Sequence, residues 1–465
     1  MILYFFLLLM TSFQMETLPT EPSPSRQSEY QTSMVRSDAY APSWEVNDAT
    51  NALFKALVEA AREKKPYFSA QQFYNYYTKN ILYKETDGRF LPLSPAETDL
   101  DKVIRYRVDK HPLVYGLDLA HCEERGWYQG QDALKRRATA ISIVRKAWQQ
   151  YGAVPILSWH LENPYVPHAY YSVNKNSVGA IYNKAKGTLH LPDGRTIPYP
   201  SKHANVPREI LNGAAFDDGV RIVDHEGYWL PSNSSTKCGR GTLEGDDNPG
   251  YDSPREWFDA SLEALCTLIN EFTDENGDGI PLILRLFHEP ETRFAWWGYG
   301  VSKNDYKELM RYAVSRIRSL CPHKNVLFAY CKDRYWGTET YGDRYPGDDY
   351  IDLVGYDDYS ICSSDDSDKS VITRMRILTD FARMHHKVPA LFETGNKSEY
   401  AKKHAFLNER LYGIVMSEGV NLGIVQLWST FTTSGDSAIL RDYQDFLNRP
   451  DIRTFSGTRP FSTPQ

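Results

Sequence analysis

Several features that mark other classes of protein are missing from this sequence. Its six cysteines include no C-x-x-C pair, which argues against a structural zinc site. No glycine-rich phosphate turn follows the first expected strand, where a dinucleotide-binding sheet would carry one. Positive charge is not in excess: a net charge of −7 and a pI near 6.0 argue against nucleic acid or an anionic membrane surface as a partner.

Apolar runs long enough to span a membrane are also missing. Residues 1–10 are apolar, but this run is too short to cross a bilayer and fits the core of a signal peptide instead. We therefore predict a signal peptide over 1–14 and secretion, either to the periplasm or outside the cell. Residues 15–44, rich in Pro, Ser, Thr and Gln, predict a disordered leader. We expect residues 45–455 to form one monomeric catalytic domain without a membrane-spanning segment.

Aromatic residues, in contrast, are abundant. The chain has 32 Tyr, 20 Phe and 10 Trp, which together make up 13% of its residues. Such side chains fill protein cores, but they also form flat apolar surfaces on which sugar rings can stack. The composition therefore suits a carbohydrate-binding surface without requiring one.

Short apolar runs alternate with amphipathic helical patterns along the chain. Helices are predicted over 48–64, 133–151, 305–319, 370–385 and 408–418, and 257–272 is an amphipathic stretch. Buried strands are predicted over 67–72, 113–120, 154–160, 282–288, 326–330, 351–357, 389–393 and 423–428. Strands that are mostly separated by helices in this way are typical of an α/β domain folded as a (β/α)8 TIM barrel. An open doubly wound sheet is the alternative, but it would want the missing glycine-rich turn.

Polar or aromatic side chains occur where several of these strands end. They are Asp118, Trp159, His160, His288, Glu289, Asp357, Glu393 and Trp428. In a parallel barrel the carboxyl ends of all strands meet on one face, and catalytic groups lie there. The polar segment 164–251 breaks the alternation between the third and fourth strands. A loop of this length is usually functional, so we expect a specificity insertion that lies over the catalytic face.

Two glutamates, Glu289 and Glu393, each follow a buried strand and would face each other across the ring. Hydrolysis of a glycosidic bond requires such a pair, with one carboxyl protonated to donate to the leaving oxygen and the other ionised. A separation of roughly 5–5.5 Å predicts retention of configuration, and roughly 6.5–9.5 Å predicts inversion. Arg285 and His288 neighbour the first acid in sequence, and Tyr359 could hydrogen-bond the second.

These residues stand in motifs that resemble glycoside hydrolase family 26, whose best-known members are β-mannanases. The matching motifs are Trp159-His-Leu-Glu-Asn-Pro164, Arg285-Leu-Phe-His-Glu289, Trp296-Trp-Gly298, Tyr345-Pro-Gly-Asp-Asp-Tyr-Ile-Asp352, Gly355-Tyr-Asp-Asp-Tyr359, Leu391-Phe-Glu-Thr-Gly395 and Gln426-Leu-Trp428. They follow the family's order from about residue 50 to about residue 450.

The resemblance implies a retaining glycosidase that cleaves β-1,4-mannosidic bonds in mannan, galactomannan or glucomannan. It implies Glu289 as the acid/base and Glu393 as the nucleophile. Neither a metal nor another cofactor is expected, because two carboxyls and stacking rings supply the chemistry. The expected substrate contacts are His160, His288, Phe294, Trp297, Tyr359, Trp428, Trp159, Asn163 and Arg285.

One departure from the family pattern bears on specificity. Members commonly read His-Glu-Met-Asn-Gly and then Trp-Phe-Trp-Trp-Gly, whereas this chain has His288-Glu-Pro-Glu-Thr292 and Phe294-Ala-Trp-Trp-Gly298. Phe294 thus stands where a tryptophan usually stacks on the leaving-side sugar. A β-1,3-xylanase or mixed-linkage β-glucanase of the same family therefore remains an alternative. So does a catalytically silent glycan-binding protein.

Structural roles are also open for several of these residues. Trp297 and Trp428 could pack the barrel, and His160 could be a hydrogen-bonded core histidine. Glu291 is expected to be solvated or to support its neighbours rather than to react. Asp357 is expected to make a structural hydrogen bond.

Overall fold

The structure is a computed structural model, and the residues it describes all lie from Tyr40 onward. They are 40–70, 82–84, 90–92, 112–119, 131–161, 181–183, 188–190, 196–198, 206–213, 222–225, 228–231, 253–291, 295–298, 301–333, 340–362, 367–395, 405–427, 441–442, 445–454 and 461. The predicted signal peptide and the leader up to residue 39 lie outside this set. Three predicted substrate contacts, Asn163, Phe294 and Trp428, also lie outside it.

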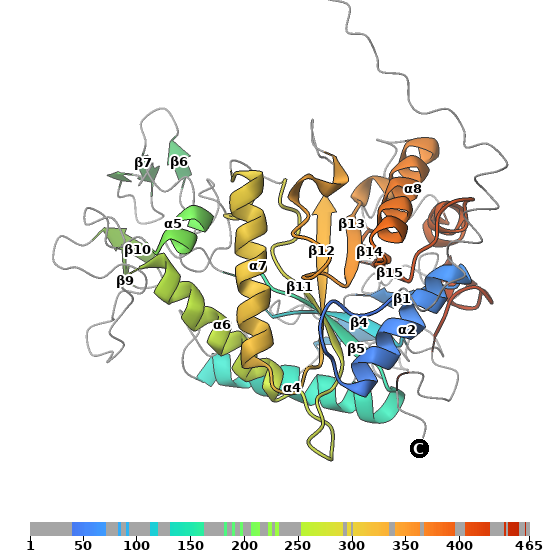
Figure 1. The fold of residues 1–465 in the computed structure, drawn as a ribbon, viewed down its shortest axis with the longest axis horizontal. Helices are drawn as coiled ribbons and strands as arrows, with labels where there is room; N and C mark the ends of the chain where they lie inside the picture. The colour runs from blue at the N-terminus through green and yellow to red at the C-terminus, as the bar shows by residue number, and fades with distance from the viewer. Residues whose placement is uncertain are drawn as a thin grey trace, which may run out of the picture. The chain divides into compact units, whose positions relative to one another are not determined.

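Eight parallel strands form a nearly closed barrel (Figure 1). Their order around the ring is β1 (Tyr67–Ala70), β15 (Ile424–Leu427), β14 (Val388–Glu393), β13 (Leu353–Asp357), β12 (Val326–Asp333), β11 (Leu282–Arg285), β5 (Val154–Ser158) and β4 (Val114–Asp118). Neighbouring strands pair in parallel, and β1 also contacts β4, which brings the two ends of the sheet together. These are the strands predicted from the sequence, and the predicted TIM-barrel fold is confirmed.

The strands form because their apolar runs are buried on both faces. Every residue of β4, β5, β11, β13, β14 and β15 is buried, as expected between a filled barrel interior and outer helices. Packing between β13 and β14 leaves no room for a side chain at Gly355. A Cβ there would lie 2.3 Å from the Phe392 ring and 2.6 Å from the Ala390 carbonyl oxygen.

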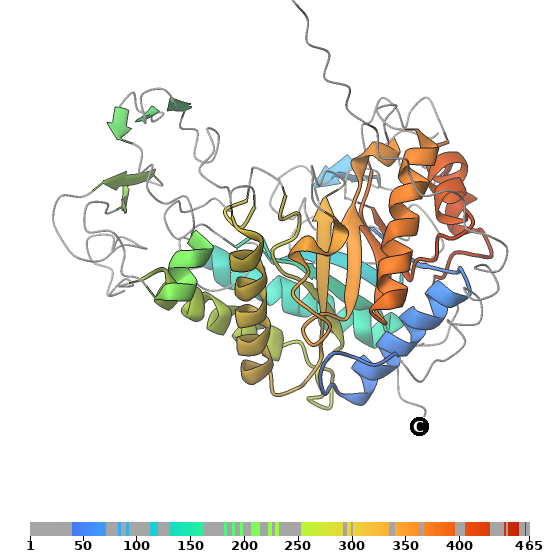
Figure 2. The ribbon, with the colours of Figure 1, turned by 45° about the horizontal axis from the view of Figure 1, so that its top comes forward.

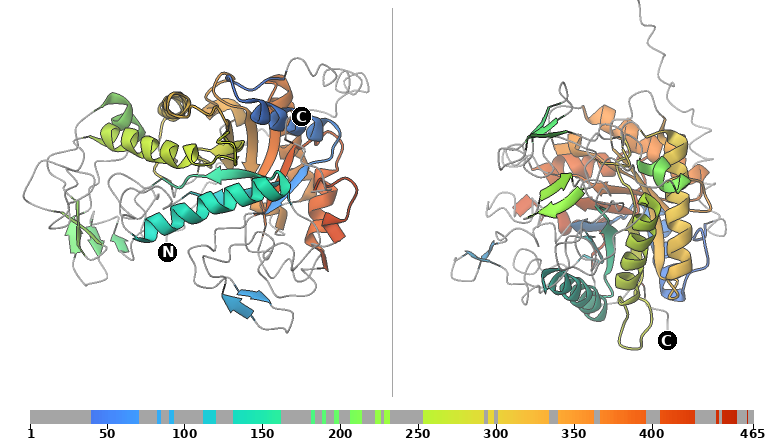
Figure 3. Two further views of the ribbon diagram at one scale, coloured as in Figure 1. Left: turned by 90° about the horizontal axis from the view of Figure 1, so that it is seen from below. Right: turned by 90° about the vertical axis from the view of Figure 1, so that its left-hand side faces the viewer.

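Helices surround the barrel (Figures 1 and 3). They are α2 (Asp48–Arg62), α4 (Gln131–Tyr151), α6 (Pro254–Asn270), α7 (Lys303–Leu320), α8 (Asp368–Met384) and α10 (Tyr412–Val415), with the 3-10 helices η5 (Tyr341–Arg344) and η6 (Tyr359–Cys362). The side chains of Asn47, Ser253, Ser302 and Ser367 cap α2, α6, α7 and α8 by accepting a backbone N–H. The predicted helices are confirmed, although 408–418 begins as a π-helix, η7 (Phe406–Leu411).

The long segment 164–251 contains short strands and one described helix. These are β6 (Ile181–Asn183), β7 (Thr188–His190), β8 (Thr196–Pro198), α5 (Val206–Asn212), β9 (Ile222–His225) and β10 (Tyr228–Pro231); another pair, β2 (Leu82–Lys84) and β3 (Phe90–Pro92), follows β1. Helix α5 packs against α6 and α7 (Figure 2), and Arg208 pairs with Asp305 at 2.8 Å. Because most of 164–251 is not described, its place over the catalytic face stays a prediction.

The first described residues pack on the barrel. The Tyr40 ring lies edge-on to His386 with 5.3 Å between ring centroids, and the Trp44 indole N–H donates to the Val326 carbonyl (2.9 Å). The end of the predicted leader 15–44 therefore contacts the barrel. Within the described ranges, no helix combines the length and the apolar character needed to cross a membrane.

Candidate active site

The two predicted acids lie at the carboxyl ends of barrel strands. Glu393 is the last residue of β14, and Glu289 lies just beyond the end of β11. Both are nearly buried, with exposed fractions of 4% and 8%. Burial, followed by the negative charges of Asp357 and Glu393, raises the pKa of Glu289 well above its usual value. The two acids therefore influence each other's charge, as a catalytic pair must.

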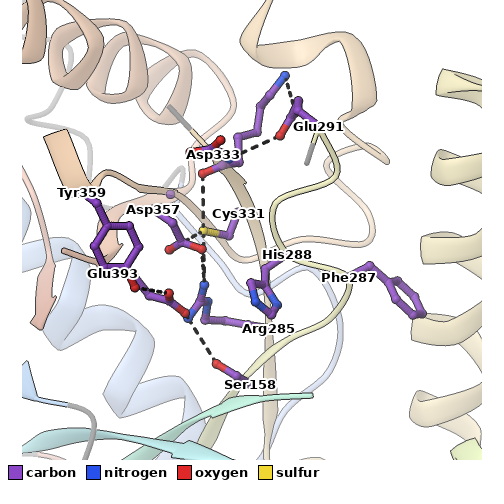
Figure 4. Close-up of polar contacts among 12 residues, drawn as sticks. Ser158, Arg285, Phe287, His288, Glu291, Cys331, Asp333, Asp357, Tyr359 and Glu393 are labelled. Atoms are coloured by element: carbon purple, nitrogen blue, oxygen red, sulfur yellow. Dashed lines mark hydrogen bonds and ion pairs between the residues drawn. The ribbon is translucent and has the colours of Figure 1, made fainter. Parts of the chain in front are cut away.

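Arg285, at the end of β11, joins the groups around Glu393 (Figure 4). Its fully buried guanidinium donates to Glu393 Oε1 (2.8 Å) and to Asp357 Oδ2 (2.7 Å), and also to Ser158 Oγ (3.2 Å). Burial favours the neutral form, but Asp357 and the other nearby anionic groups raise the pKa of Arg285 well above its usual value. The site thus contains one fixed positive charge that two carboxylates share.

A bulge in β14 aims Glu393 at that guanidinium. Strands β13 and β14 pair regularly until Tyr356 and Leu391, after which the register shifts and Asp357 lies opposite Glu393. The second oxygen of Glu393, Oε2, accepts a hydrogen bond from the Tyr359 hydroxyl (2.8 Å). The hydrogen bond expected between Tyr359 and the second acid is therefore present. With both oxygens bonded, the carboxylate is held in one orientation and its charge is stabilised.

Glu289 is presented by a strained stretch of backbone. Phe287 and Glu289 have φ values of 46° and 52°, in the left-handed region that residues with side chains rarely adopt. Three hydrogen bonds to other parts of the chain hold this backbone. The Tyr306 hydroxyl donates to the Phe287 carbonyl (2.8 Å), and Trp297 Nε1 donates to the His288 carbonyl (2.8 Å). The Glu289 N–H donates to the Cys331 carbonyl (3.0 Å). Backbone strain of this kind persists only where its surroundings fix it, and it often marks a functional site. Phe287 points away from the acids, whereas His288 lies beside Arg285 (Figure 4).

Two histidines meet edge-to-face beside the acids, with 4.6 Å between the ring centroids of His160 and His288. Burial would lower the pKa of His160, but Asp118, whose Oδ2 lies 2.7 Å from Nδ1, reverses this and leaves the pKa raised. Burial, together with the positive charges of His160 and Arg285, lowers the pKa of His288 well below its usual value. His288 therefore favours the neutral form, and its buried Nδ1 has no hydrogen-bond partner.

The same residues offer potential metal ligands. One ligand atom from each of His288, Asp357 and Glu393 lies within 4.8 Å of the others. Arg285, however, already pairs with both carboxylates. A metal ion would have to compete with this fixed positive charge, so the arrangement is better suited to orienting carboxylates than to holding a cation.

Three residues predicted to touch substrate are fully buried. Trp159, Arg285 and Trp297 each have an exposed fraction of 0%, so they offer no face to a sugar. Trp297 packs edge-on against Trp296, with 5.4 Å between ring centroids, and fixes the His288 carbonyl. This burial favours support of the site over direct contact with a sugar, and the role of these three residues in substrate binding stays a prediction. For Trp297, the packing role that the sequence left open describes the structure better.

Cys331, which lies on β12 within the site, was not among the residues predicted to act there. Its buried thiol donates to Asp357 Oδ1 (3.1 Å) and accepts from Arg285 Nη2 (3.5 Å). Burial raises the pKa of the Cys331 thiol well above its usual value, so the thiol remains a donor. Both oxygens of Asp357 are thereby bonded, which agrees with the structural hydrogen bond expected for this residue. A cysteine within an apolar strand carries no sequence signal that separates this role from simple packing.

Glu291 was expected to be solvated or to support its neighbours, and the structure shows the second. Its side chain is 7% exposed and pairs with the fully buried Lys332 at 2.8 Å. Lys332 was the sequence feature that could have predicted this ion pair, because a cation within a buried strand needs a buried anion nearby.

Comparisons with known proteins agree with this architecture. The model of glycosyl hydrolase family 26 matches residues 58–188 and 247–432. A mannan endo-1,4-beta-mannosidase from Bifidobacterium adolescentis is 30% identical over 258 residues, and another from Bacillus subtilis (strain 168) is 22% identical over 273 residues. These matches cover 51% and 57% of this chain, but only 25% and 54% of the two relatives. The chain therefore spans from a quarter to about half of the length of these relatives.

Solved structures show the same fold. A GH26 β-mannanase from Bacteroides ovatus has a TM-score of 0.59 at 20% identity, covering 90% of this chain and 98% of that chain. A modular endo-β-1,4-mannanase from Cellulomonas fimi has a TM-score of 0.63 at 18% identity, covering 91% of this chain and 80% of that chain. At these identities the likeness establishes the barrel and not the substrate.

Proposed function

The chain belongs to glycosyl hydrolase family 26, and we propose that it hydrolyses β-1,4-mannosidic bonds of mannan-type polysaccharides with retention of configuration. In this proposal Glu393 is the nucleophile and Glu289 is the acid/base. The mannan endo-1,4-beta-mannosidases among its relatives support the choice of substrate.

The observation that carries the proposal is the contrast between the surroundings of the two carboxyls. Burial and neighbouring negative charges raise the pKa of Glu289, so it stays protonated where ordinary glutamates are ionised. Glu393 instead receives hydrogen bonds from Arg285 and Tyr359 on its two oxygens, which favour a charged, fixed carboxylate. One proton donor and one anion at the same rim of the barrel are what a glycosidase needs.

In the first step the Glu393 carboxylate attacks the anomeric carbon. The protonated Glu289 gives its proton to the glycosidic oxygen as the bond to the leaving sugar breaks. The leaving sugar departs as an alcohol, and the remaining sugar is esterified to Glu393. Arg285 and Tyr359 keep the nucleophile aimed during this step.

In the second step Glu289 acts as a base. It takes a proton from water as the water oxygen attacks the anomeric carbon, and the ester bond to Glu393 breaks. The Glu393 carboxylate reforms against Arg285 and Tyr359, which stabilise its returning charge. Two inversions at one carbon give net retention.

Removing each carboxyl separately tests the two roles. We expect Glu393→Ala to abolish turnover of both mannan and a dinitrophenyl β-mannobioside, because both substrates need the nucleophile. Glu289→Ala should reduce the rate on mannan by about 10²–10⁴-fold. It should spare kcat/KM for the dinitrophenyl substrate, whose leaving group needs no proton. Release of reducing ends and of dinitrophenol measures these rates, with circular dichroism to confirm folding.

A polysaccharide panel tests the substrate. We expect the wild-type protein to release reducing ends from mannan and not from β-1,3-xylan or mixed-linkage β-glucan. If reducing ends are released from β-1,3-xylan alone or from mixed-linkage β-glucan alone, that polysaccharide is the substrate instead of mannan. Calorimetric binding of mannan without any release would favour the silent glycan-binding protein. Wild-type turnover by Glu393→Ala would remove the nucleophile assignment.

A further inference from the structure

Glu291 lies two residues after the acid/base and is attached by its side chain to the neighbouring strand, β12. We propose that Glu291 is a positioning residue for Glu289 and that it acts through a buried ion pair with Lys332. The inference rests on the acid/base role proposed for Glu289. At this position the chain has a glutamate where family members commonly have an asparagine.

The contacts of Glu291 form a tether between the segment after β11 and the end of β12 (Figure 4). Lys332 Nζ lies 2.8 Å from Glu291 Oε1, and the two side chains are 0% and 7% exposed. The Asp333 N–H donates to Glu291 Oε2 (3.3 Å), and Lys332 Nζ also donates to the Thr340 carbonyl (3.0 Å). Neither buried charge is stable there without the other, so the tether is maintained as a unit.

This tether continues an attachment that begins at the acid/base itself. Regular pairing of β11 with β12 ends before Glu289 is reached. Beyond that point the Glu289 N–H bonds to the Cys331 carbonyl (3.0 Å). Two residues later, the Glu291 side chain is held at Lys332 and Asp333. The left-handed backbone of Glu289, with φ of 52°, is therefore fixed to successive residues of β12 on its C-terminal side.

Asp333 gives the tether an electrostatic effect on the acid. Its carboxylate adds to burial and to the charges of Asp357 and Glu393 in raising the pKa of Glu289. Without the Glu291 carboxylate, the Lys332 ammonium loses the anion that balances it, and the local charge becomes more positive. This change lowers the pKa of Glu289, so the acid loses its proton at a lower pH.

Leaving-group dependence separates this role from general damage to the fold. For Glu291→Gln we expect kcat/KM to fall by about 100-fold on phenyl β-mannobioside, whose leaving group needs the proton of Glu289. We expect less than about a threefold change on dinitrophenyl β-mannobioside, which bypasses acid catalysis. The alkaline limb of the pH profile for the phenyl substrate should also move to lower pH.

Asp352→Asn is the matched control. Asp352 is a fully buried acid that accepts the Phe328 N–H (2.7 Å), but it immediately precedes β13, at the opposite end of that strand from Asp357. This variant should lower the melting temperature without changing the ratio of the rates on the two substrates. If Glu291→Gln does not fold, the double variant Glu291→Met/Lys332→Met removes both charges together and should show the same selective loss.

The outcomes for the inference and for the proposed function are distinct. A wild-type protein that cleaves neither aryl substrate nor any polysaccharide would overturn the proposed function itself. If the wild type is active but the folded Glu291 variant loses both aryl activities equally, or loses neither, Glu291 does not position the acid and the proposed function stands. Selective loss with a shifted alkaline limb supports the inference.

Discussion

At the scale of single residues, Arg285 links the surroundings of the nucleophile Glu393 to those of the acid/base Glu289. It holds the nucleophile directly, through Glu393 Oε1 at 2.8 Å, and it pairs with Asp357 at 2.7 Å. Asp357 in turn is one of the negative charges that keep Glu289 protonated. The Arg285 cation therefore stabilises the Glu393 carboxylate, while Asp357 and Glu393 disfavour ionisation of Glu289.

The raised pKa of Glu289 predicts the pH dependence of activity. The acid must be protonated in the first step, so kcat/KM on phenyl β-mannobioside should persist below the raised pKa and fall as pH rises through it. This alkaline limb should lie well above the ordinary carboxyl value of 4.5. With the dinitrophenyl substrate, which needs no proton from Glu289, this alkaline limb should be absent from kcat/KM in the wild type as well as in Glu289→Ala. An alkaline limb near pH 4.5 in the wild type, or one that survives in the variant, would contradict this assignment.

The sequence indicated which residue types would meet at the site, but not how they would be joined. Strand-end positions predicted Glu289, Glu393 and His160, because side chains at the ends of parallel strands converge. Burial could not be predicted in the same way. Trp297 follows the acid closely enough to suggest stacking on a sugar, yet its ring faces the core and its N–H holds the His288 carbonyl.

At the scale of elements, the contact between β13 and β14 sets the geometry of the nucleophile. The bulge after Tyr356 and Leu391 aligns Glu393 with Asp357, and the close approach of the strands depends on Gly355. Apolar runs predict these strands because burial on both faces requires them. A bulge adds a residue without changing the apolar pattern, so it was not visible in the sequence.

Substitution at Gly355 tests this contact. In Gly355→Ala the added Cβ would lie 2.3 Å from Phe392 and would force apart the strands that carry Asp357 and Glu393. We therefore expect the protein to be destabilised by about 1–3 kcal/mol through overpacking. We also expect kcat to fall, because the two carboxyls would be displaced. Chemical denaturation and mannan assays measure the two effects. Gly413→Ala is the control, since a Cβ there meets nothing within 4 Å and alanine favours its helix. Equal stability of the two variants would contradict the proposed role of the contact.

The barrel as a whole brings together residues that are distant in the chain. Arg285 and Glu393 are separated by 108 positions in sequence, and they hydrogen-bond from strands β11 and β14, between which β12 and β13 lie. The regular alternation of strands and helices was enough to predict this ring. The segment 164–251 follows no such alternation, and its short strands and α5 could not be predicted from apolar periodicity.

The central claim is that Glu393 forms an ester with the sugar and that Glu289 serves both steps. Proton NMR of manno-oligosaccharide hydrolysis tests this claim, provided that spectra are recorded before mutarotation equilibrates the anomers. Two displacements at the anomeric carbon predict that the new reducing end appears first as the β-anomer, with the α-anomer growing in later. Initial accumulation of the α-anomer would mean that water attacks directly, and it would contradict this account.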